Sequence, residues 1–396
     1  MTYPDGVSGR WLSTTLGEIG EYLNGRGFKK SEWSERGRMI IRIQDLTGTG
    51  NAPNYFAGDC DDKHVVRDGD LLISWAATLD AFIWNGPEAV LNQHIFKVRS
   101  KIDHRFHYYL VKHVMSDLQR RAHGSGMVHI TKRQFEETPV FIPTSAAEQR
   151  RIVIALEEQM TKLEAGVAEI DAAAARLRRY KSRALSAAIE DRADWPVEQL
   201  GDVVLSMRNG LSHKPEGHDG VRILRISAVR PMAVDLEDVR YLDRDKADER
   251  FLIQTDDLIF TRYNGNPELV GVCGRVRDVY EPTLHPDKLI RAQVDDARAN
   301  PAYLEIALNT GVARQHIRRS TKTTAGQAGI AGSDLKKTPV PLPPLWHQER
   351  IAAIVHSRLG VAAEVERSII TARRRADRLG QALLAAAFAG RLGKVA

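Results

Sequence analysis

Four basic, turn-rich loops hold the side chains of this sequence that are best suited to chemistry. Two lie in the first half of the chain, and two lie at matching places in the second half. Arg and Lys neutralise phosphates, glycine allows close backbone approach, and Asn, Gln, His, Ser and Arg read base edges. One such loop alone would be a solvated turn, but four in a chain of net charge +6 favour DNA. The candidates in these loops are Asn24, Arg26, Lys29, Lys30, Arg120, Arg121, Ser125, Met127, Asn209, His213, Lys214, Arg318, Arg319, Lys322 and Gln327.

Four further candidates follow two similar β-type runs, DLLISW and DLIFTRYN. Trp75 ends the first run, and Arg262, Tyr263 and Asn264 end the second. Matching strands would bring these residues to the same kind of surface. Trp75 has an equally good alternative as part of a hydrophobic core.

Signatures of catalysis and of metal binding are absent from the sequence. It has no GxxxxGK[ST] phosphate loop, no Asn-Pro-Pro-Tyr or Asp-Pro-Pro-Tyr tetrapeptide, and no glycine-rich cofactor loop after a strand. His104, His107 and His113 have no cysteine or carboxylate that completes a ligand set, so we expect no metal. Cys60 and Cys273 lie far apart, which suits a reducing cytoplasm. An apolar run long enough for a membrane span and an N-terminal signal segment are also lacking, so we expect a cytoplasmic protein.

An internal repeat organises the whole chain. Residues 138–152 read TPVFIPTSAAEQRRI and residues 338–351 read TPVPLPPLWHQERI. Earlier in each half, WLSTTLGE matches WPVEQLGD, IRI matches LRI, and GDLLIS matches DDLIFT, in the same order. The shared order predicts two similar units, each followed by the same second element.

That second element is a long helix. Residues 145–190 contain no proline and one glycine, and residues 345–389 have a similar composition. Each helix would span roughly 65–70 Å at 1.5 Å per residue, too long to bury its stripe in one small domain. Apolar residues recur every seven positions, which predicts a coiled-coil seam. The seam candidates are Ile152, Leu156, Leu163, Ile170, Leu177, Ile351, Val355, Val365, Ile369, Leu379 and Leu383.

The sequence therefore predicts an α+β fold with a pseudo-twofold repeat. Two mixed α/β domains, 8–143 and 193–343, would be separated by two long helices, 144–192 and 344–392, that form a coiled-coil spacer.

The chain resembles the specificity subunits of Type I restriction-modification systems. The paired W-x4-LG-[ED] starts, the paired GDLLIS/DDLIFT runs, and the TPV-x-x-P ends that lead into EQRRI and HQERI carry the resemblance over residues 8–392. It implies a noncatalytic subunit whose two domains are target-recognition domains, each reading one half of a bipartite double-stranded DNA site. It also implies that the two long spacer helices are antiparallel. It also implies two modification (methyltransferase) subunits that hold S-adenosylmethionine, and restriction or motor subunits that use ATP and Mg, while this chain binds no cofactor.

Two other functions are compatible with the repeat. A standalone Type II nuclease or methyltransferase with two recognition heads would need a catalytic domain, and no unassigned stretch is long enough for one. A non-enzymatic bridging scaffold would keep the repeat but leave the matched basic loops unexplained.

Overall fold

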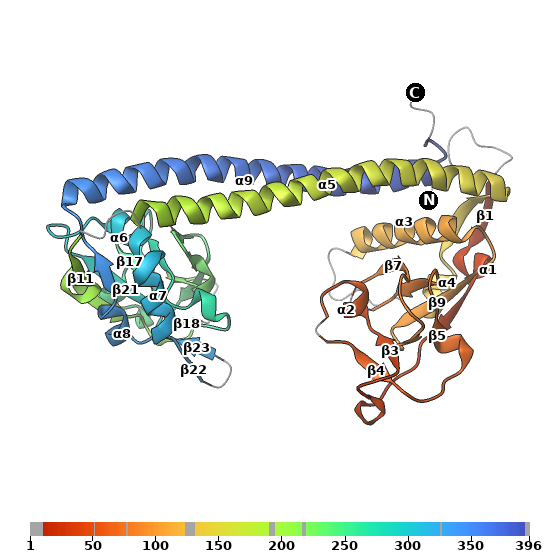
Figure 1. Cartoon of the computed structure of the whole chain (residues 1–396), viewed down its shortest axis with the longest axis horizontal. Coiled ribbons are helices and arrows are strands. Elements are labelled where there is room, and N and C mark those ends of the chain that lie inside the picture. Colours follow the sequence, from red (N-terminus) through yellow and green to blue (C-terminus); the bar gives the residue numbers. More distant parts are fainter. Residues whose placement is uncertain are drawn as a thin grey trace. The chain divides into compact units, whose positions relative to one another are not determined.

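The computed structural model describes residues 11–50, 52–76, 78–122, 131–189, 195–215, 219–324 and 327–392 (Figure 1). The chain forms two compact units, one of residues up to Ala172 and from Ile370 onward, the other of Ala173–Ile369. Two 44-residue helices, α5 (Ala146–Ile189) and α9 (Leu345–Phe388), each contribute residues to both units. We call the described residues from Trp11 to Pro143 head 1 and those from Trp195 to Pro343 head 2.

The described part of head 1 contains three sheets. An antiparallel ladder joins β1 (Trp11–Thr15) to β10 (Pro139–Pro143), so the chain enters and leaves head 1 at neighbouring positions. The second sheet is antiparallel, in the order β2-β9-β6-β7 (Gly20–Asn24, Ile95–Ser100, Leu71–Ser74, Asp80–Ile83). The third is mixed, with β3 parallel to β8, in the order β4-β3-β8-β5 (Asn54–Phe56, Arg38–Ile41, Ala89–Leu91, Val65–Val66).

Head 2 repeats this plan. Its entry and exit ladder joins β11 (Val197–Gln199) to β24 (Pro339–Pro341). Its antiparallel sheet has the order β12-β21-β17-β19 (Val204–Asn209, Leu289–Val294, Leu258–Thr261, Cys273–Arg275), and its mixed sheet, with β13 parallel to β20, has the order β16-β13-β20 (Val239–Leu242, Val221–Leu224, Thr283–Leu284). The internal repeat is therefore confirmed in strand order and direction. Head 2 adds the pair β14-β15 (Val229–Arg230, Ala233–Val234) and the small sheet β18-β23-β22 (Tyr263–Asn264, Gln327–Gly329, Lys322–Thr324).

The helices of the heads also correspond. Head 1 has α1 (Leu16–Ile19), α2 (Ile43–Leu46), α3 (His104–Ala122) and α4 (Lys132–Glu136). Where head 1 has the single helix α3, head 2 has α6 (Pro301–Leu308) and α7 (Gly311–Ser320), followed by α8 (Gly332–Lys336). Gly311, at φ +52°, starts the second segment in the left-handed region that favours glycine. Single 3-10 turns lie at Lys30–Glu32, Asp62–His64, Leu200–Asp202, Ile226–Ala228, Arg244–Lys246, Glu249–Phe251 and Pro267–Leu269.

A glutamine links each head to the long helix that follows it. Gln149, in the EQRRI motif, accepts a hydrogen bond from the Asp103 backbone N–H (2.9 Å) and donates to the Pro143 carbonyl (2.8 Å). Gln348, in HQERI, accepts from Asn300 N–H (2.8 Å) and donates to the Pro343 carbonyl (2.7 Å). Both side chains are buried, so each bridges backbone groups that water does not reach. The repeated Gln of the two motifs therefore joins a head to its helix.

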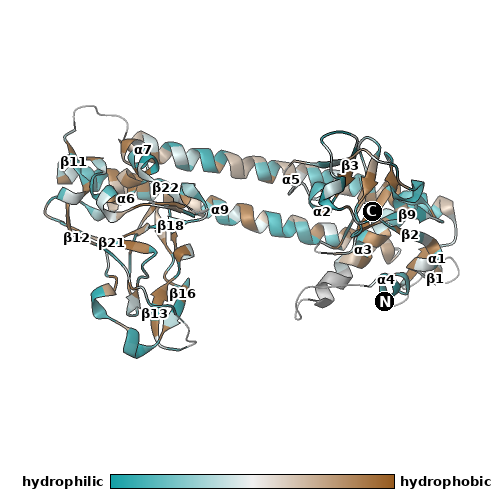
Figure 2. Cartoon of the chain, turned by 90° about the horizontal axis from the view of Figure 1, so that it is seen from below, coloured by the Kyte–Doolittle hydropathy of each residue, from teal (hydrophilic) through white to brown (hydrophobic). Residues whose placement is uncertain are grey.

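Within each unit, segments of α5 and α9 pack antiparallel. In one unit, Arg373 pairs with Asp171 at 2.9 Å, and a Cβ on Gly380 would lie 3.3 Å from Leu163. In the other, Lys181 pairs with Glu366 at 2.6 Å. Teal turns alternate with paler and brown turns along both helices (Figure 2), as expected of one apolar stripe on a polar helix.

Burial supports most of the predicted seam and corrects two positions. Ile152, Leu156, Ile351 and Val355 are buried, and the half-buried residues are Leu163, Ile170, Leu177, Ile369 and Leu383. Val365 and Leu379 are 44% and 52% exposed, so the prediction that they belong to the seam is wrong. One partner helix covers only a narrow stripe, and these two side chains lie beside it.

Candidate nucleic-acid interface

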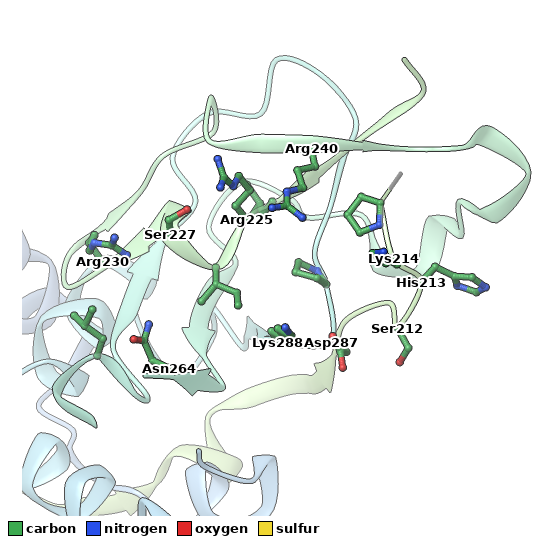
Figure 3. A pocket seen from close by; sticks show the side chains of 15 residues that line it. Ser212, His213, Lys214, Arg225, Ser227, Arg230, Arg240, Asn264, Asp287 and Lys288 are labelled. Atoms are coloured by element: carbon green, nitrogen blue, oxygen red, sulfur yellow. The ribbon is translucent and has the colours of Figure 1, made fainter. Parts of the chain in front are cut away.

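A cavity of about 740 Å³ in head 2 gathers basic side chains (Figure 3). Among the described residues, its lining includes five cations and one carboxylate, that of Asp287. The cations come from separate parts of the fold: a loop after β12, the residue after β13, the strands β14 and β16, and the turn before β21. They are Lys214, Arg225, Arg230, Arg240 and Lys288.

Three of these cations are not neutralised within the described part of the chain. Arg230, Arg240 and Lys288 are exposed, and none of them forms an ion pair with a described carboxylate. Arg225 has a distant partner, since its Nη1 lies 3.5 Å from Asp238 Oδ1. Positive charge that converges on one cavity without internal partners attracts a polyanion.

Arg and Lys supply this charge, and the buried His285 beside the cavity does not. His285 is buried directly before the turn that carries Asp287 and Lys288, and its Nδ1 donates to the Phe251 carbonyl at 2.8 Å. Burial lowers the pKa of His285 to about 4, so its ring is neutral at pH 7. The Arg and Lys side chains of the cavity stay charged across the physiological pH range.

Head 1 has a smaller cavity in the corresponding place. It has a volume of about 140 Å³ and is lined by Arg42, Ile43, Gln44, Asn92, His94 and Ile95. Arg42 follows β3 as Arg225 follows β13. Asp45 holds the Arg42 guanidinium, with contacts of 3.0 and 3.2 Å, so this head offers mainly amide and imidazole groups where head 2 offers cations.

Matching backbone contacts build the turn that borders each cavity. In head 1, Asn92 bridges Arg26, Ile95 N–H donates to the Asn92 carbonyl, and Trp75 N–H donates to the His94 carbonyl. In head 2, the corresponding contacts are the bridge of Pro286 with Leu211, and the bonds from Leu289 N–H to Pro286 and from Arg262 N–H to Lys288. The matched contacts place Gln93 and Asp287 at the same position of the same turn.

The two Asn-Gly pairs have a structural role that corrects our interpretation of these glycines. A Cβ on Gly25 would lie 2.1 Å from the Asn92 carbonyl oxygen, and a Cβ on Gly210 would lie 2.1 Å from that of His285. Only glycine allows each loop to pack this closely beside the turn. The close approach is to the protein's own backbone.

Most of the predicted candidates of head 2 lie at the cavity, on the small sheet beside it, or at the end of α7. His213, Lys214 and Asn264 line the cavity, and the exposed Asn209 ends the adjoining strand β12. Lys322 and Gln327 are exposed on β22 and β23, in the small sheet that contains Tyr263 and Asn264, while Arg319 is exposed at the end of α7.

Two arginines of head 2 have partners within the protein. Arg318 pairs with Glu268. Arg262 donates to the Asp287 carbonyl (3.2 Å) and lies over the Tyr263 ring (4.7 Å). Arg262 therefore supports the turn.

The predicted candidates of head 1 differ in exposure and pairing, and some of them lie outside the described residues. Asn24, Lys29 and Lys30 are exposed, but Arg26 pairs with Glu32 and lies over the rings of Phe28 and Phe56. Trp75 packs against the core, with its ring 5.7 Å from Phe96 and 5.5 Å from His94. The side chains of Arg120 and Arg121, and the residues Ser125 and Met127, lie outside the described part of the chain.

Sequence reasoning missed several residues of these cavities. Arg42 and Arg225 lie in the repeated IRI and LRI segments, so superimposing the two repeats could have found them. Arg230, Arg240 and Lys288 carry no such signal, because strand pairing and a turn bring them together from separate segments. The other missed polar residues of the head 1 cavity are Gln44, Asn92 and His94, and Gln93 lies on the turn beside it.

A third cavity, of about 450 Å³, lies between α3, β7 and α5 of one unit and differs in charge. Arg105 pairs with Glu157 at 2.6 Å, and Lys112 pairs with Asp80 at 3.1 Å. Since its cations have internal partners, this cavity has no excess charge for a polyanion. The described residues contain no cluster of His, Cys, Asp and Glu able to hold a metal ion, and no described helix could span a membrane.

Comparison with known proteins identifies the family. Residues 9–169 match the model described as "Type I restriction modification DNA specificity domain". The Type I restriction enzyme EcoKI specificity subunit of Escherichia coli K12 is 34% identical over 68% of this chain and 61% of its own length. The chain belongs to the Type I restriction specificity family.

Other members agree over a longer span. The EcoBI specificity subunit of Escherichia coli is 25% identical over 96% of this chain and 86% of its own length. A chain solved in work on "complex assembly and conformational transition of the type I R-M system" has the same fold, with a TM-score of 0.70, 16% identity, and coverage of 98% of this chain and 100% of that one. The alignment with the EcoKI subunit thus spans about three-fifths of that relative, and the alignment with the EcoBI subunit spans most of it.

Proposed function

We propose that this chain is the DNA-reading subunit of a Type I restriction-modification system. Each head reads one half of a bipartite duplex site, and the chain directs methyltransferase and restriction subunits to that site. The observation that supports this most strongly is the cavity of head 2, where Arg230, Arg240 and Lys288 converge without described carboxylate partners. The matching turn and cavity of head 1 support a reading surface at the same place in that head.

The long helices supply the other half of the proposal. Large apolar side chains remain exposed on α5 and α9, which is typical of surfaces that bind other proteins. They include Ile154, Ile354, Val361, Val365, Ile370 and Leu379. Modification subunits that dock here would bring S-adenosylmethionine, and motor subunits would bring ATP and Mg chemistry, so the chain itself needs only to bind DNA and its partners.

Salt dependence of DNA binding tests the role of the cavity. Each phosphate contact of a cation contributes about 0.9 to the slope of log K against log salt concentration. Arg240→Ala should therefore flatten the slope by about 0.9, and Arg240→Ala with Lys288→Ala by about 1.8. Fluorescence anisotropy of the full chain on labelled duplex DNA measures both. Arg178→Ala, which removes an exposed cation of α5, is the matched control and should leave the slope unchanged.

Two results would overturn the proposal. If the full chain binds no duplex at low salt, the bridging scaffold is the better function. If the pure chain alone methylates or cuts DNA when given S-adenosylmethionine, ATP and Mg, it is a standalone enzyme.

A further inference from the structure

One carboxylate lies among the cations of the head 2 cavity. Asp287 is half-buried next to Lys288, with Ser212 nearby (Figure 3). No described Arg or Lys forms an ion pair with it, although five cations line the same cavity. A carboxylate repels the DNA backbone, so a residue that only contacted phosphate would not be acidic here. Its oxygens can only accept hydrogen bonds, which points to a donor on the ligand.

The position of Asp287 is that of a reading residue. Asp287 N–H donates to the Leu211 carbonyl (2.9 Å), and its carbonyl accepts from the Arg262 guanidinium (3.2 Å). The backbone is thus held on both sides while the carboxylate remains without a described partner. Gln93 occupies the same position in head 1, where it is exposed and its Nε2 lies 3.2 Å from His94 Nε2.

The two side chains fit different bases. Cytosine presents an N4 amino donor in the major groove, which suits an acceptor-only carboxylate. Adenine presents an N6 donor beside an N7 acceptor, and N7 would repel a carboxylate but accept from an amide. A glutamine matches that donor–acceptor pair with both of its amide atoms. Lys288, the next residue along the turn, carries donors that guanine O6 and N7 accept, and guanine pairs with cytosine.

We propose that this turn sets one base in each half-site: Gln93 of head 1 selects adenine and Asp287 of head 2 selects cytosine. The inference rests on the proposed function, because it assigns a base to residues of the same reading surfaces. Because the two turns are equivalent, they should read an equivalent base pair in each half-site.

Selection from randomised duplexes with the full chain tests the assignment. Asp287→Asn exchanges an acceptor-only group for an amide of the same shape, so the preference at one position of one half-site should move from cytosine to adenine. Gln93→Glu makes the reverse exchange and should move one position of the other half-site from adenine to cytosine. For a single hydrogen-bonded base, the change in relative binding should be roughly tenfold to a hundredfold. All other positions should keep their bases.

Matched controls separate base reading from charge. Asp296→Asn is the control for Asp287→Asn, because it makes the same change at an exposed residue of head 2 outside the cavity. Gln159→Glu is the control for Gln93→Glu, at an exposed position of α5. Both should enrich the wild-type motif. Asp287→Ala, which removes the carboxylate without adding a donor, should lose discrimination at that one position and gain no new preference.

The outcomes distinguish a failure of the proposed function from a failure of the base assignment. A wild-type chain that enriches no motif would overturn the proposed function itself. If the wild-type chain enriches a motif, and the Asp287→Asn and Asp296→Asn variants both enrich that same motif, only the inference is overturned. The inference also fails if Asp287→Asn changes binding to all sequences equally, because the side chain would then act on the backbone.

Discussion

Replacing Gln348 with methionine removes the link between head 2 and the start of α9 while nearly preserving side-chain length. Gln348 is buried, and its two amide atoms bond the Asn300 N–H and the Pro343 carbonyl. Methionine fills a similar space but offers neither a strong acceptor nor a donor. The substitution therefore isolates the two hydrogen bonds from packing.

The magnitude follows from the two backbone groups that lose their partners. A buried donor or acceptor left without a hydrogen bond costs about 1–3 kcal/mol, so the loss of both bonds should destabilise the unit by roughly 2–6 kcal/mol. That unit comprises Ala173–Ile369, and for about 200 residues one kcal/mol lowers the melting temperature by roughly 2–4 °C. We expect the melting temperature of this unit to fall by about 4–24 °C.

Differential scanning calorimetry of the full chain measures this, because two compact units allow two transitions. Gln348→Met should shift the transition of the unit that contains head 2, and Gln149→Met should shift the other. Gln381→Met and Gln159→Met make the same chemical change at exposed positions of the same two helices and serve as controls. If Gln348→Met melts together with Gln381→Met, the buried amide does not hold the junction and the reasoning is refuted.

Two further predictions concern acid stability and helix length. His107 is buried against Tyr22 and Ser100, and burial lowers its pKa to about 3, so the unfolded state takes up a proton that the folded state excludes. This contribution to the stability of the unit that contains head 1 should be fully present above about pH 6.5 and decline toward pH 3, with a loss of about 2 kcal/mol at pH 5. Urea unfolding at pH 7 and pH 5 measures this loss, which should be smaller in His107→Gln. An equal loss in the wild-type protein and the variant would contradict the assignment to His107. Inserting four helix-forming residues after Ala173 and four after Ala372 adds about 6 Å at nearly one full turn, so the methylated site should gain one or two spacer base pairs with both half-sites unchanged. Methylome sequencing would show this. If the enlarged complex were active but methylated only sites with the original spacer length, the helices would not set the distance between the half-sites.

Sequence periodicity predicted the parts of the fold that depend on local order. The heptad positions Leu156 and Val355 are buried, and the helices that contain them have no proline to stop them. The same rule failed at Val365 and Leu379, because a heptad pattern does not tell which of two apolar lines a single partner helix covers. The matched motifs EQRRI and HQERI were recognised as junctions, but only three-dimensional contacts reveal that Gln149 and Gln348 make them.

The candidate site was harder to predict, because exposure and pairing decide which cations are available. Arg26 and Arg318 lie in stretches that the sequence predicts to be basic loops, yet Arg318 lies in α7 and each arginine has a carboxylate partner. Arg240 lies in an unremarkable strand, yet pairing with β13 brings it to the cavity. Composition therefore indicated one loop that borders the cavity, that of His213 and Lys214, while non-local strand pairing determined which other residues line it.

The division of the two units along the chain has a consequence for synthesis. Ala173–Ile369 is one continuous segment, whereas the other unit needs residues from both ends of the chain. Phe388, near the end of α9, packs against Phe106 and His113 with ring centroids 5.3 Å apart in each case. As the ribosome works from the N-terminus, head 1 emerges first but lacks these side chains until the end of α9 has been synthesised. Head 2 can close its core earlier, so a nascent or prematurely terminated chain exposes the apolar surface around Phe106 and Leu156, where chaperones and proteases would act first.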